Sequence, residues 1–221
     1  MAIALLPSGH INGKQTTAAV DTTGADLLLV GVNSPVGHNF ATDSKGSGTW
    51  DNQAYVRNVV GAFEARINYL LAPSPVGAGH TFSTSPTIFY EGVSVASFSG
   101  VAALDQAQAD KWDTNSTIHP TSVAAVTPTV DGCVVITCVA LLDDPGTLTP
   151  PAGFTLIDGV FPTAWGLAWA YQIQTTAAAV TPEWTSTNSI RSCGITNVFA
   201  PSGGGGGGST LPVKLAQLLR A

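Results

Sequence analysis

Residues 163–174 show the clearest pattern of hydrophobic and polar positions in the chain, because large and small side chains alternate strictly there. The large side chains on one face are Trp165, Leu167, Trp169, Tyr171 and Ile173. The opposite face carries Gly166, Ala168, Ala170, Gln172 and Gln174. A period of two residues is typical of a β-strand with one buried face and does not suit a helix. The pattern predicts a strand whose aromatic face belongs to the core.

Further segments have the composition of strands and are separated by residues that favour turns. They are 26–32, 93–101, 133–142 and 195–199. Segments 26–32 and 133–142 are apolar on both faces, which is typical of central strands. Two segments favour a helix, weakly 52–63 and more strongly 213–220. Short strands between turns predict an all-β fold, and we expect a two-sheet antiparallel β-sandwich that is jelly-roll-like.

The sequence repeats itself with a period of about a hundred residues, which is too long for a solenoid. Tyr69 and Phe82 match Tyr171 and Trp184 at one constant offset. Each pair follows a predicted buried strand. The match favours two related half-repeats, and a chance likeness between sandwich strands is the alternative.

We expect one sandwich domain over 21–201, because half-units with one apolar face bury most surface by packing against each other. One half-repeat spans about 21–105 and the other spans about 124–201. An N-terminal arm at 1–20 precedes them. Only 106–123 resembles a linker between them.

A different composition begins at 202–221, where six glycines occupy 203–208. Polyglycine has no side chains to bury and loses much entropy on ordering, so a flexible tether is expected. An apolar stripe follows it, formed by Leu211, Val213, Leu215, Leu218 and Leu219. So short a segment is not a stable helix by itself. It is either an anchoring peptide that docks on a subunit, a partner or the parent domain, or a disordered terminus, and both interpretations stay open.

Charged residues are scarce, at 10% of the chain against about 25% in an average soluble domain. The formal net charge is −6 and the eight basic residues are scattered, so a nucleic-acid partner is not expected. Residues 1–10 lack the basic flank and cleavage site of a signal peptide. No run approaches the roughly 18 apolar residues of a membrane span, so no membrane partner is expected.

Three cysteines are present, Cys133, Cys138 and Cys193. An odd number without a leader favours reduced, buried thiols. Cys133 and Cys138 would face opposite sides of one strand and could not bond to each other. A disulfide between either of them and Cys193 stays open.

No motif for catalysis, metal binding or cofactor binding is present. The four histidines stand alone, without the spacing of zinc ligands. There is no nucleophile elbow and no phosphate loop, and 43–50 lacks most of the ligands of a calcium loop. We therefore expect a protein that is not an enzyme and that binds no metal or cofactor.

Two kinds of residue remain as candidates for a ligand site. Acidic residues lie in or beside predicted turns, and no pair stands out among Asp105, Asp110, Asp113, Asp143, Asp144 and Glu183. Trp50 and Trp112 lie in predicted loops rather than on a core face. These two tryptophans are the better candidates for a ligand or partner surface.

Two stretches carry a resemblance to known proteins. One is the strand 26–30 with the loop 43–50, and the other is 95–101 leading to 104–106. Together they resemble β-sandwich modules of tailed-bacteriophage structural proteins and of some bacterial surface proteins. The resemblance covers most of 20–200, and it implies a virion or surface module without catalytic residues.

The expected function is that of a virion structural protein, a capsid decoration or head-fibre protein, with a tail-associated role close behind. It would be made in the host cytoplasm, form homo-oligomers, and bind the major capsid protein or other virion proteins through 211–221 or 1–13. One alternative is a carbohydrate-binding module that binds a host-surface glycan near Trp50 or Trp112. A second is a sandwich-type glycoside hydrolase, which needs two carboxylates in a cleft.

Overall fold

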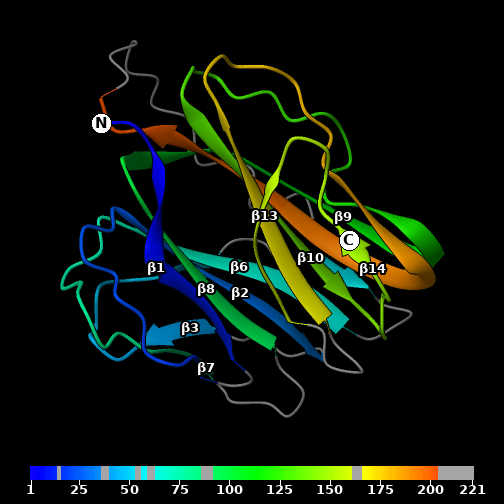
Figure 1. Ribbon diagram of the computed structural model, residues 1–221, viewed down its shortest axis with the longest axis horizontal. Coiled ribbons are helices and arrows are strands. Elements are labelled where there is room, and N and C mark those ends of the chain that lie inside the picture. The colour runs from blue at the N-terminus through cyan, green and yellow to red at the C-terminus, as the bar shows by residue number, and fades with distance from the viewer. Residues whose placement is uncertain are drawn as a thin grey trace.

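The computed structural model describes residues 1–13, 16–35, 40–52, 56–58, 63–85, 92–160 and 166–203. Within these ranges every regular element is a β-strand, and every strand pairing is antiparallel. The strands form two large sheets and one small two-stranded sheet (Figure 1). The predicted all-β sandwich is therefore confirmed.

The first large sheet is drawn from the first half of the chain. Its strands in spatial order are β1 (Ala4–Gly13), β8 (Gly92–Ser99), β2 (Leu27–Pro35) and β6 (Phe63–Leu71), and both β4 (Asp51–Asn52) and β5 (Val56–Asn58) pair with β6. β2 is central, as its two apolar faces predicted. The segment expected to be an N-terminal arm includes β1, an edge strand paired with β8.

The second large sheet is drawn from the second half. Its strands in spatial order are β9 (Val101–Pro120), β14 (Glu183–Pro201), β10 (Cys133–Leu141), β13 (Gly166–Gln174) and β12 (Thr155–Val160), and β11 (Leu148–Thr149) also pairs with β14. The strands β9, β14, β10, β13 and β12 follow the same spatial order as β1, β8, β2, β6 and the pair β4 and β5 in the first sheet. A duplicated unit would produce this arrangement. The jelly-roll likeness is not confirmed, since each sheet comes from one contiguous half.

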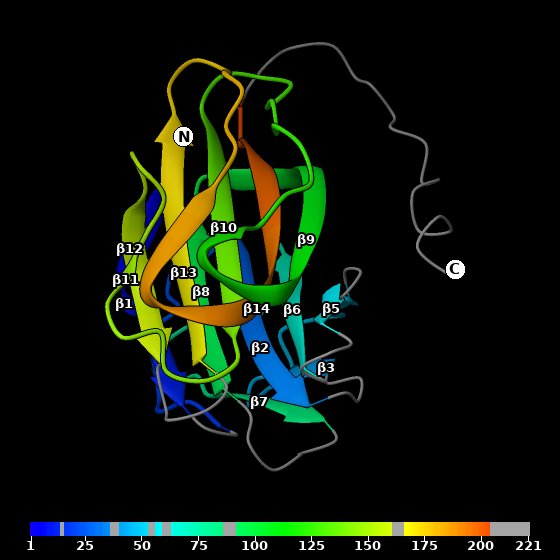
Figure 2. The same ribbon diagram turned by 90° about the vertical axis from the view of Figure 1, so that its right-hand side faces the viewer.

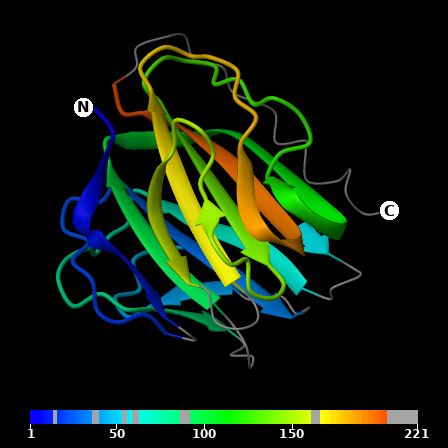
Figure 3. The ribbon, with the colours of Figure 1, turned by 45° about the vertical axis from the view of Figure 1, so that its right-hand side comes forward.

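A small flap of strands covers the outer face of each sheet. On the first sheet, β3 (Phe40–Asp43) pairs with β7 (Phe82–Ser85), and Thr16 and Val20 form bridges to Ser83 and His80. On the second, β11 and the C-terminal end of β9 pair with the first residues of β14. Figure 3 shows the yellow-to-orange strands of the second sheet lying across the blue-to-green strands of the first.

The main core lies between the two sheets, and two reciprocal aromatic pairs join them. Tyr69 of β6 meets Phe199 of β14 with ring centroids 5.6 Å apart at 70°. Phe98 of β8 meets Tyr171 of β13 at 5.6 Å and 74°. Each half therefore contributes one Tyr and one Phe. Edge-to-face contacts of this kind stabilise by roughly 0.5–1.5 kcal/mol beyond simple burial.

Trp169 provides the closest fit between the sheets. Its indole lies over Gly31 of β2, where an added Cβ would stand 2.8 Å from the ring. Its Nε1 donates a hydrogen bond of 2.7 Å to Ser94 Oγ of β8. The missing side chain at Gly31 is therefore what allows the Trp169 indole to enter the core.

The predicted aromatic face of 163–174 is right only in its central part. Leu167 and Trp169 are fully buried, whereas Tyr171 is half-buried and Ile173 is 38% exposed. Trp165 lies outside the described residues. The prediction for Ile173 is wrong because β13 continues beyond the first sheet to the end of the sandwich, where Ile173 borders Met1 and Pro201.

Two other sequence predictions are also wrong. The helix expected at 52–63 is replaced by strand pairing, since β5 and the first residue of β6 lie within it. A short helical pattern gains little alone, while pairing with β6 satisfies the backbone. The linker expected at 106–123 lies mostly in β9, an edge strand paired along β14. The helix expected at 213–220 lies outside the described residues.

The three cysteines are buried and none forms a disulfide. Burial raises the pKa of Cys133 to about 11 and raises that of Cys138 further, with a smaller contribution from Cys193 to the latter. A buried thiol with a raised pKa is a poor nucleophile. These side chains therefore serve as small apolar residues of the second sheet.

Candidate functional site

A groove of about 560 Å³ lies on the outer side of the second sheet. One wall is the turn between β11 and β12, and the other is the segment that enters β14. Figure 2 shows the strands β11, β12 and β14 that these segments join. Its lining residues are Thr149, Pro150, Pro151, Ala152, Phe154, Gln172, Val180, Thr181, Glu183 and Thr185. The volume falls within the roughly 300–1,000 Å³ that is usual for small-ligand sites.

Phe154 is the aromatic side chain of the groove and is held firmly. It packs at once against two apolar clusters on the outer face of the sheet, one around Trp184 and one around Val135. It remains half-buried, so part of its ring faces the groove. Such a ring presents an apolar surface at low entropic cost, because the packing has already fixed its orientation.

Gln172 and Glu183 supply the polar groups of the groove. Gln172 Oε1 accepts a hydrogen bond of 3.4 Å from Gln174 Nε2, and its own Nε2 lies against Gly153. A Cβ at Gly153 would stand 2.9 Å from that nitrogen, and the φ of +80° there already favours glycine. Glu183 is exposed, and no hydrogen bond to its carboxylate occurs within the described residues. Both groups are therefore available to a ligand.

The flap on the first sheet encloses a buried network around His80. His80 Nε2 lies 2.9 Å from Asp43 Oδ1, and Nδ1 lies 2.9 Å from Thr22 Oγ1. Trp50 Nε1 donates to Asp43 Oδ2 at 3.1 Å. Burial alone would raise the pKa of Asp43, but hydrogen bonds from His80, the Ser47 backbone and Trp50 hold it below the ordinary value.

Ser47, His80 and Asp43 have the composition of a catalytic triad but not its geometry. In a triad the hydroxyl and the carboxylate bind opposite ring nitrogens, whereas Ser47 Oγ and Asp43 Oδ1 both approach Nε2, at 3.4 and 2.9 Å. Ser47 Oγ also donates to the Pro75 carbonyl at 2.6 Å. Ser47 and His80 are buried. The network therefore closes the flap and presents no nucleophile.

The flap on the second sheet is joined to it by hydroxyl groups instead. Thr121 Oγ1 lies 2.6 Å from Thr137 Oγ1 and 2.8 Å from Thr196 Oγ1. Trp184 Nε1 donates to Thr137 Oγ1 at 3.2 Å. All four residues are fully buried. Hydrogen bonding satisfies these buried polar groups without a charge.

His119 belongs to the same flap and is neutral. Its Nε2 lies 2.7 Å from Ser186 Oγ, and Ser186 itself donates to the Asn188 carbonyl at 2.6 Å. The imidazole must therefore be the donor to Ser186. Its Nδ1 is buried and has no partner within the described residues. Burial lowers the pKa of His119 to about 4.

Trp50 and Trp112, the residues predicted as a ligand or partner surface, lie in different parts of the fold. Trp50 is half-buried and its ring packs edge-on against Phe82, at 6.1 Å. It therefore belongs to the flap of the first sheet. Trp112, in β9, pairs with Ser192 of β14, and the side chain of Trp112 lies outside what the structure describes. The anchoring peptide, with Leu211, Val213, Leu215, Leu218 and Leu219, also lies outside the described residues.

Glu183 is the only predicted carboxylate that lines the groove. Hydrolysis of a glycoside needs two, so the groove lends no support to the hydrolase alternative. Sequence reasoning missed Phe154 and Gln172. The turn at 150–154 was a visible signal, but nothing in the sequence places it beside Val180 and Thr181.

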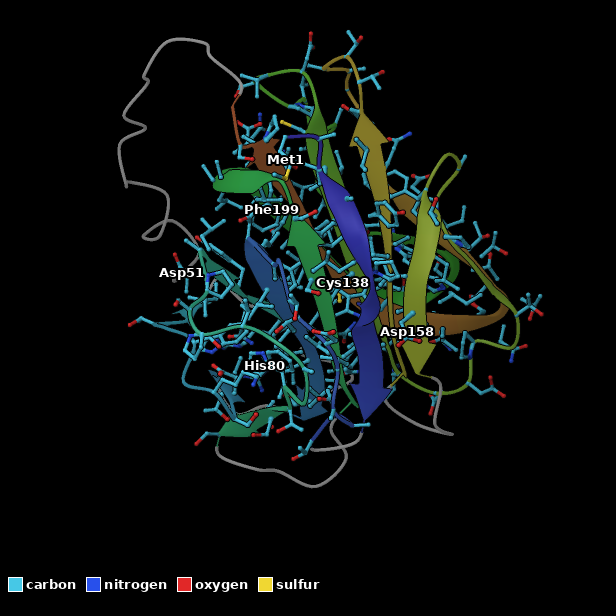
Figure 4. The ribbon with its side chains drawn as sticks, turned by 60° about the vertical axis from the view of Figure 1, so that its left-hand side comes forward. Met1, Asp51, His80, Cys138, Asp158 and Phe199 are labelled. Carbon is cyan, nitrogen blue, oxygen red and sulfur yellow. The ribbon has the colours of Figure 1, made fainter. Side chains whose placement is uncertain are left out.

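Both ends of the described chain meet at one end of the sandwich. The amino group of Met1 donates a hydrogen bond of 2.8 Å to the Ser202 carbonyl. A pocket of about 400 Å³ lies there, lined largely by Met1, Ile3, Ile173, Pro201 and Gly203. Figure 4 shows Met1 and Phe199 toward this end and His80 toward the other. Gly203, the last described residue, therefore lies beside an apolar pocket.

In the part of the chain that the structure describes, no group of three or more His, Cys, Asp or Glu side chains is arranged to hold a metal ion. The same residues contain no helix that is long and apolar enough to cross a membrane.

No family model, no curated protein and no solved structure matches this chain.

Proposed function

We propose that the chain is a structural display module, a β-sandwich attached to a larger assembly through its C-terminal segment. One observation carries this proposal: the two ends of the described chain meet at the Met1–Ser202 contact. A segment that starts at this point attaches the sandwich by one end and leaves its sides and far end exposed. Because β1 is an edge strand of the first sheet, residues 4–13 are committed to the fold, and 211–221 is the anchor.

The distribution of charge supports an anchor of this kind. All 14 acidic residues lie in 1–203 with six basic residues, which gives that part a formal charge of −8. Residues 204–221 contain Lys214 and Arg220 and no acidic residue, a formal charge of +2. Opposite charges favour association of this segment with the sandwich of another copy, or with another acidic surface. A homo-oligomer built through the C-terminal segment is the simplest result.

The assembly that we propose is the virion of a tailed bacteriophage, in which the module decorates the capsid or forms a head fibre. The resemblance of 26–30, 43–50, 95–101 and 104–106 to virion modules supports this role. Its partners are then the major capsid protein or other virion proteins. The buried, hydrogen-bonded flaps fit a display scaffold, because they stabilise its shape and offer no nucleophile.

The anchor is tested on the full chain with the triple variant Leu215→Asp, Leu218→Asp and Leu219→Asp. We expect light scattering to show an oligomer for the unmodified chain and a monomer for the variant, with unchanged thermal unfolding. Ile118→Asp is the matched control, since Ile118 is 49% exposed on the sandwich itself. An oligomeric state that is the same in all three proteins would contradict the anchor.

The virion role is tested by immunogold electron microscopy of phage particles from the organism that encodes the chain, with antibodies against the sandwich. Labelling of capsids is expected, and labelling of tails would move the module to the tail. Particles that carry no label, alongside labelled protein elsewhere in the lysate, would contradict a virion role.

A further inference from the structure

We propose that the groove on the second sheet is a binding site for an uncharged oligosaccharide. This inference stands apart from the C-terminal anchor, because it rests only on residues between Thr149 and Thr185. It also differs from the glycan site predicted at Trp50 or Trp112, since neither residue lines the groove.

The apolar part of the groove suits the C–H faces of a sugar. Phe154 offers part of its ring, and Pro150 offers a second flat apolar surface at the same wall. The negative face of an aromatic ring attracts the weakly positive C–H groups of a pyranose. Because two clusters already fix Phe154, the ring loses little entropy when a ligand binds.

The polar part of the groove suits neighbouring hydroxyl groups. The Glu183 carboxylate can accept two hydrogen bonds, and the Gln172 amide can donate from Nε2 while Oε1 is oriented by Gln174. Thr149, Thr181 and Thr185 add hydroxyls that donate and accept. A ligand that carries both donors and acceptors at short spacing, as a vicinal diol does, matches this set.

The charge of the groove disfavours anionic sugars. No Lys, Arg or His is among the lining residues, and Glu183 contributes a negative charge. The sandwich as a whole carries an excess of acidic residues. Sugars bearing carboxylate, sulfate or phosphate would therefore be repelled.

The backbone around the groove is paired on one side. Thr149 pairs with Thr185, Glu183 with Pro120, and Gln172 with Val135. The lining side chains supply further donors and acceptors, which suits hydroxyl recognition. A peptide that adds to a strand edge is the competing ligand that the test must distinguish.

The test is calorimetric titration of the full chain with maltotriose, cellotriose, mannotriose and N-acetylchitotriose, and with sialyllactose as the anionic comparator. At least one neutral trisaccharide should bind with a dissociation constant of about 1 mM or tighter, and sialyllactose should not bind measurably. We expect Phe154→Ala and Glu183→Gln each to weaken binding by about tenfold or more.

Matched controls separate the groove from general effects of mutation. Asp143→Asn removes an exposed charge outside the groove, and its φ of 70° is one that asparagine tolerates. Leu156→Ala shortens an exposed apolar side chain of β12. Neither should change affinity. Because Phe154 also packs in the sheet, Gln172→Ala is the second groove variant if Phe154→Ala fails to fold.

Three results would overturn the proposal. They are the absence of binding by every neutral trisaccharide, tighter binding of sialyllactose than of the neutral probes, and binding that survives both Glu183→Gln and Gln172→Ala. Capture of a proline-rich peptide in place of all the sugars would assign the groove to a different class of ligand and would overturn it as well.

Discussion

The two halves of the chain fold into sheets with the same strand order, yet the flaps that cover them are closed by different chemistry. In the first half, His80 and Asp43, the last residue of β3, meet at 2.9 Å. In the second half, the flap is held by hydrogen bonds of buried threonine hydroxyls and of a neutral His119. The second flap also leaves a groove beside Phe154. One scaffold thus carries a buried histidine–carboxylate network on one outer face and a hydroxyl-linked flap beside a groove on the other.

The core between the sheets shows a similar mixture of likeness and difference. The Tyr69–Phe199 and Phe98–Tyr171 pairs have nearly the same geometry. The place of Trp169 in β13 corresponds to Ile67 in β6 by the offset that relates the two tyrosines. The reciprocal pairs hold the halves together symmetrically, and Trp169 over Gly31 makes their packing unequal.

The unequal packing predicts the largest effect of a single substitution. Trp169→Ala removes a buried indole and its hydrogen bond to Ser94, and should lower the free energy of unfolding by about 3–5 kcal/mol. Ile67→Val, at the corresponding position, should cost only about 1 kcal/mol. Chemical denaturation monitored by circular dichroism measures both. Equal losses would show that Trp169 is not a special contact between the sheets.

The difference between the flaps predicts different responses to pH. The pKa of His119 is about 4 in the folded chain and ordinarily 6.5, so the unfolded chain binds more protons between these values. The contribution of neutral His119 to the free energy of unfolding is therefore complete above pH 6.5. It falls by about 3 kcal/mol as the pH drops to 4. His119→Gln should remove this slope.

The first flap should respond in a more acidic range. The pKa of Asp43 is lowered from 3.8, so its stabilising effect is complete above pH 3.8 and is lost as the pH falls further. Asp43→Asn should then alter the pH dependence only below about pH 4. Denaturation curves measured at a series of pH values give the free energy of unfolding of His119→Gln and of Asp43→Asn. A His119→Gln variant that keeps the slope between pH 6.5 and 4 would refute the assignment of that slope to His119.

The reciprocal pairs predict the smallest effect, and it should be the same on both sides. Double-mutant cycles for Tyr69 with Phe199 and for Tyr171 with Phe98 should each give a coupling of roughly 0.5–1.5 kcal/mol. Leucine is the replacement in every case, because it keeps most of the apolar volume. Coupling in one pair and none in the other would show that the likeness of the two halves is only topological.

The sequence predicted the elements whose pattern is local. Residues 26–32 and 133–142 are apolar on both faces, and they are the central strands β2 and β10. The alternation at 163–174 placed Leu167 and Trp169 in the core but not Ile173, because alternation does not show where the partner sheet ends. At 52–63, pairing with β6 overrode a weak helical pattern.

The groove could not be predicted in the same way. Phe154 and Val180 are far apart in the sequence and belong to two connections that only the packing of the second sheet brings together. Glycine is favoured at position 153 because the side chain of Gln172 lies against it. This contact joins two segments that are neighbours in the fold. Glu183 was visible as an acidic residue beside a turn, but nothing local distinguished it from the others.

The assignment of the binding groove to the second flap rather than the first is tested most directly by nuclear magnetic resonance. Backbone amide shifts of the full chain would be followed during titration with the neutral trisaccharide that binds best in calorimetry. We predict that the shifts that change are confined to 149–154, 172 and 180–185. Changes centred on 43–50, or no changes at saturating sugar, would contradict the assignment of binding to the second sheet.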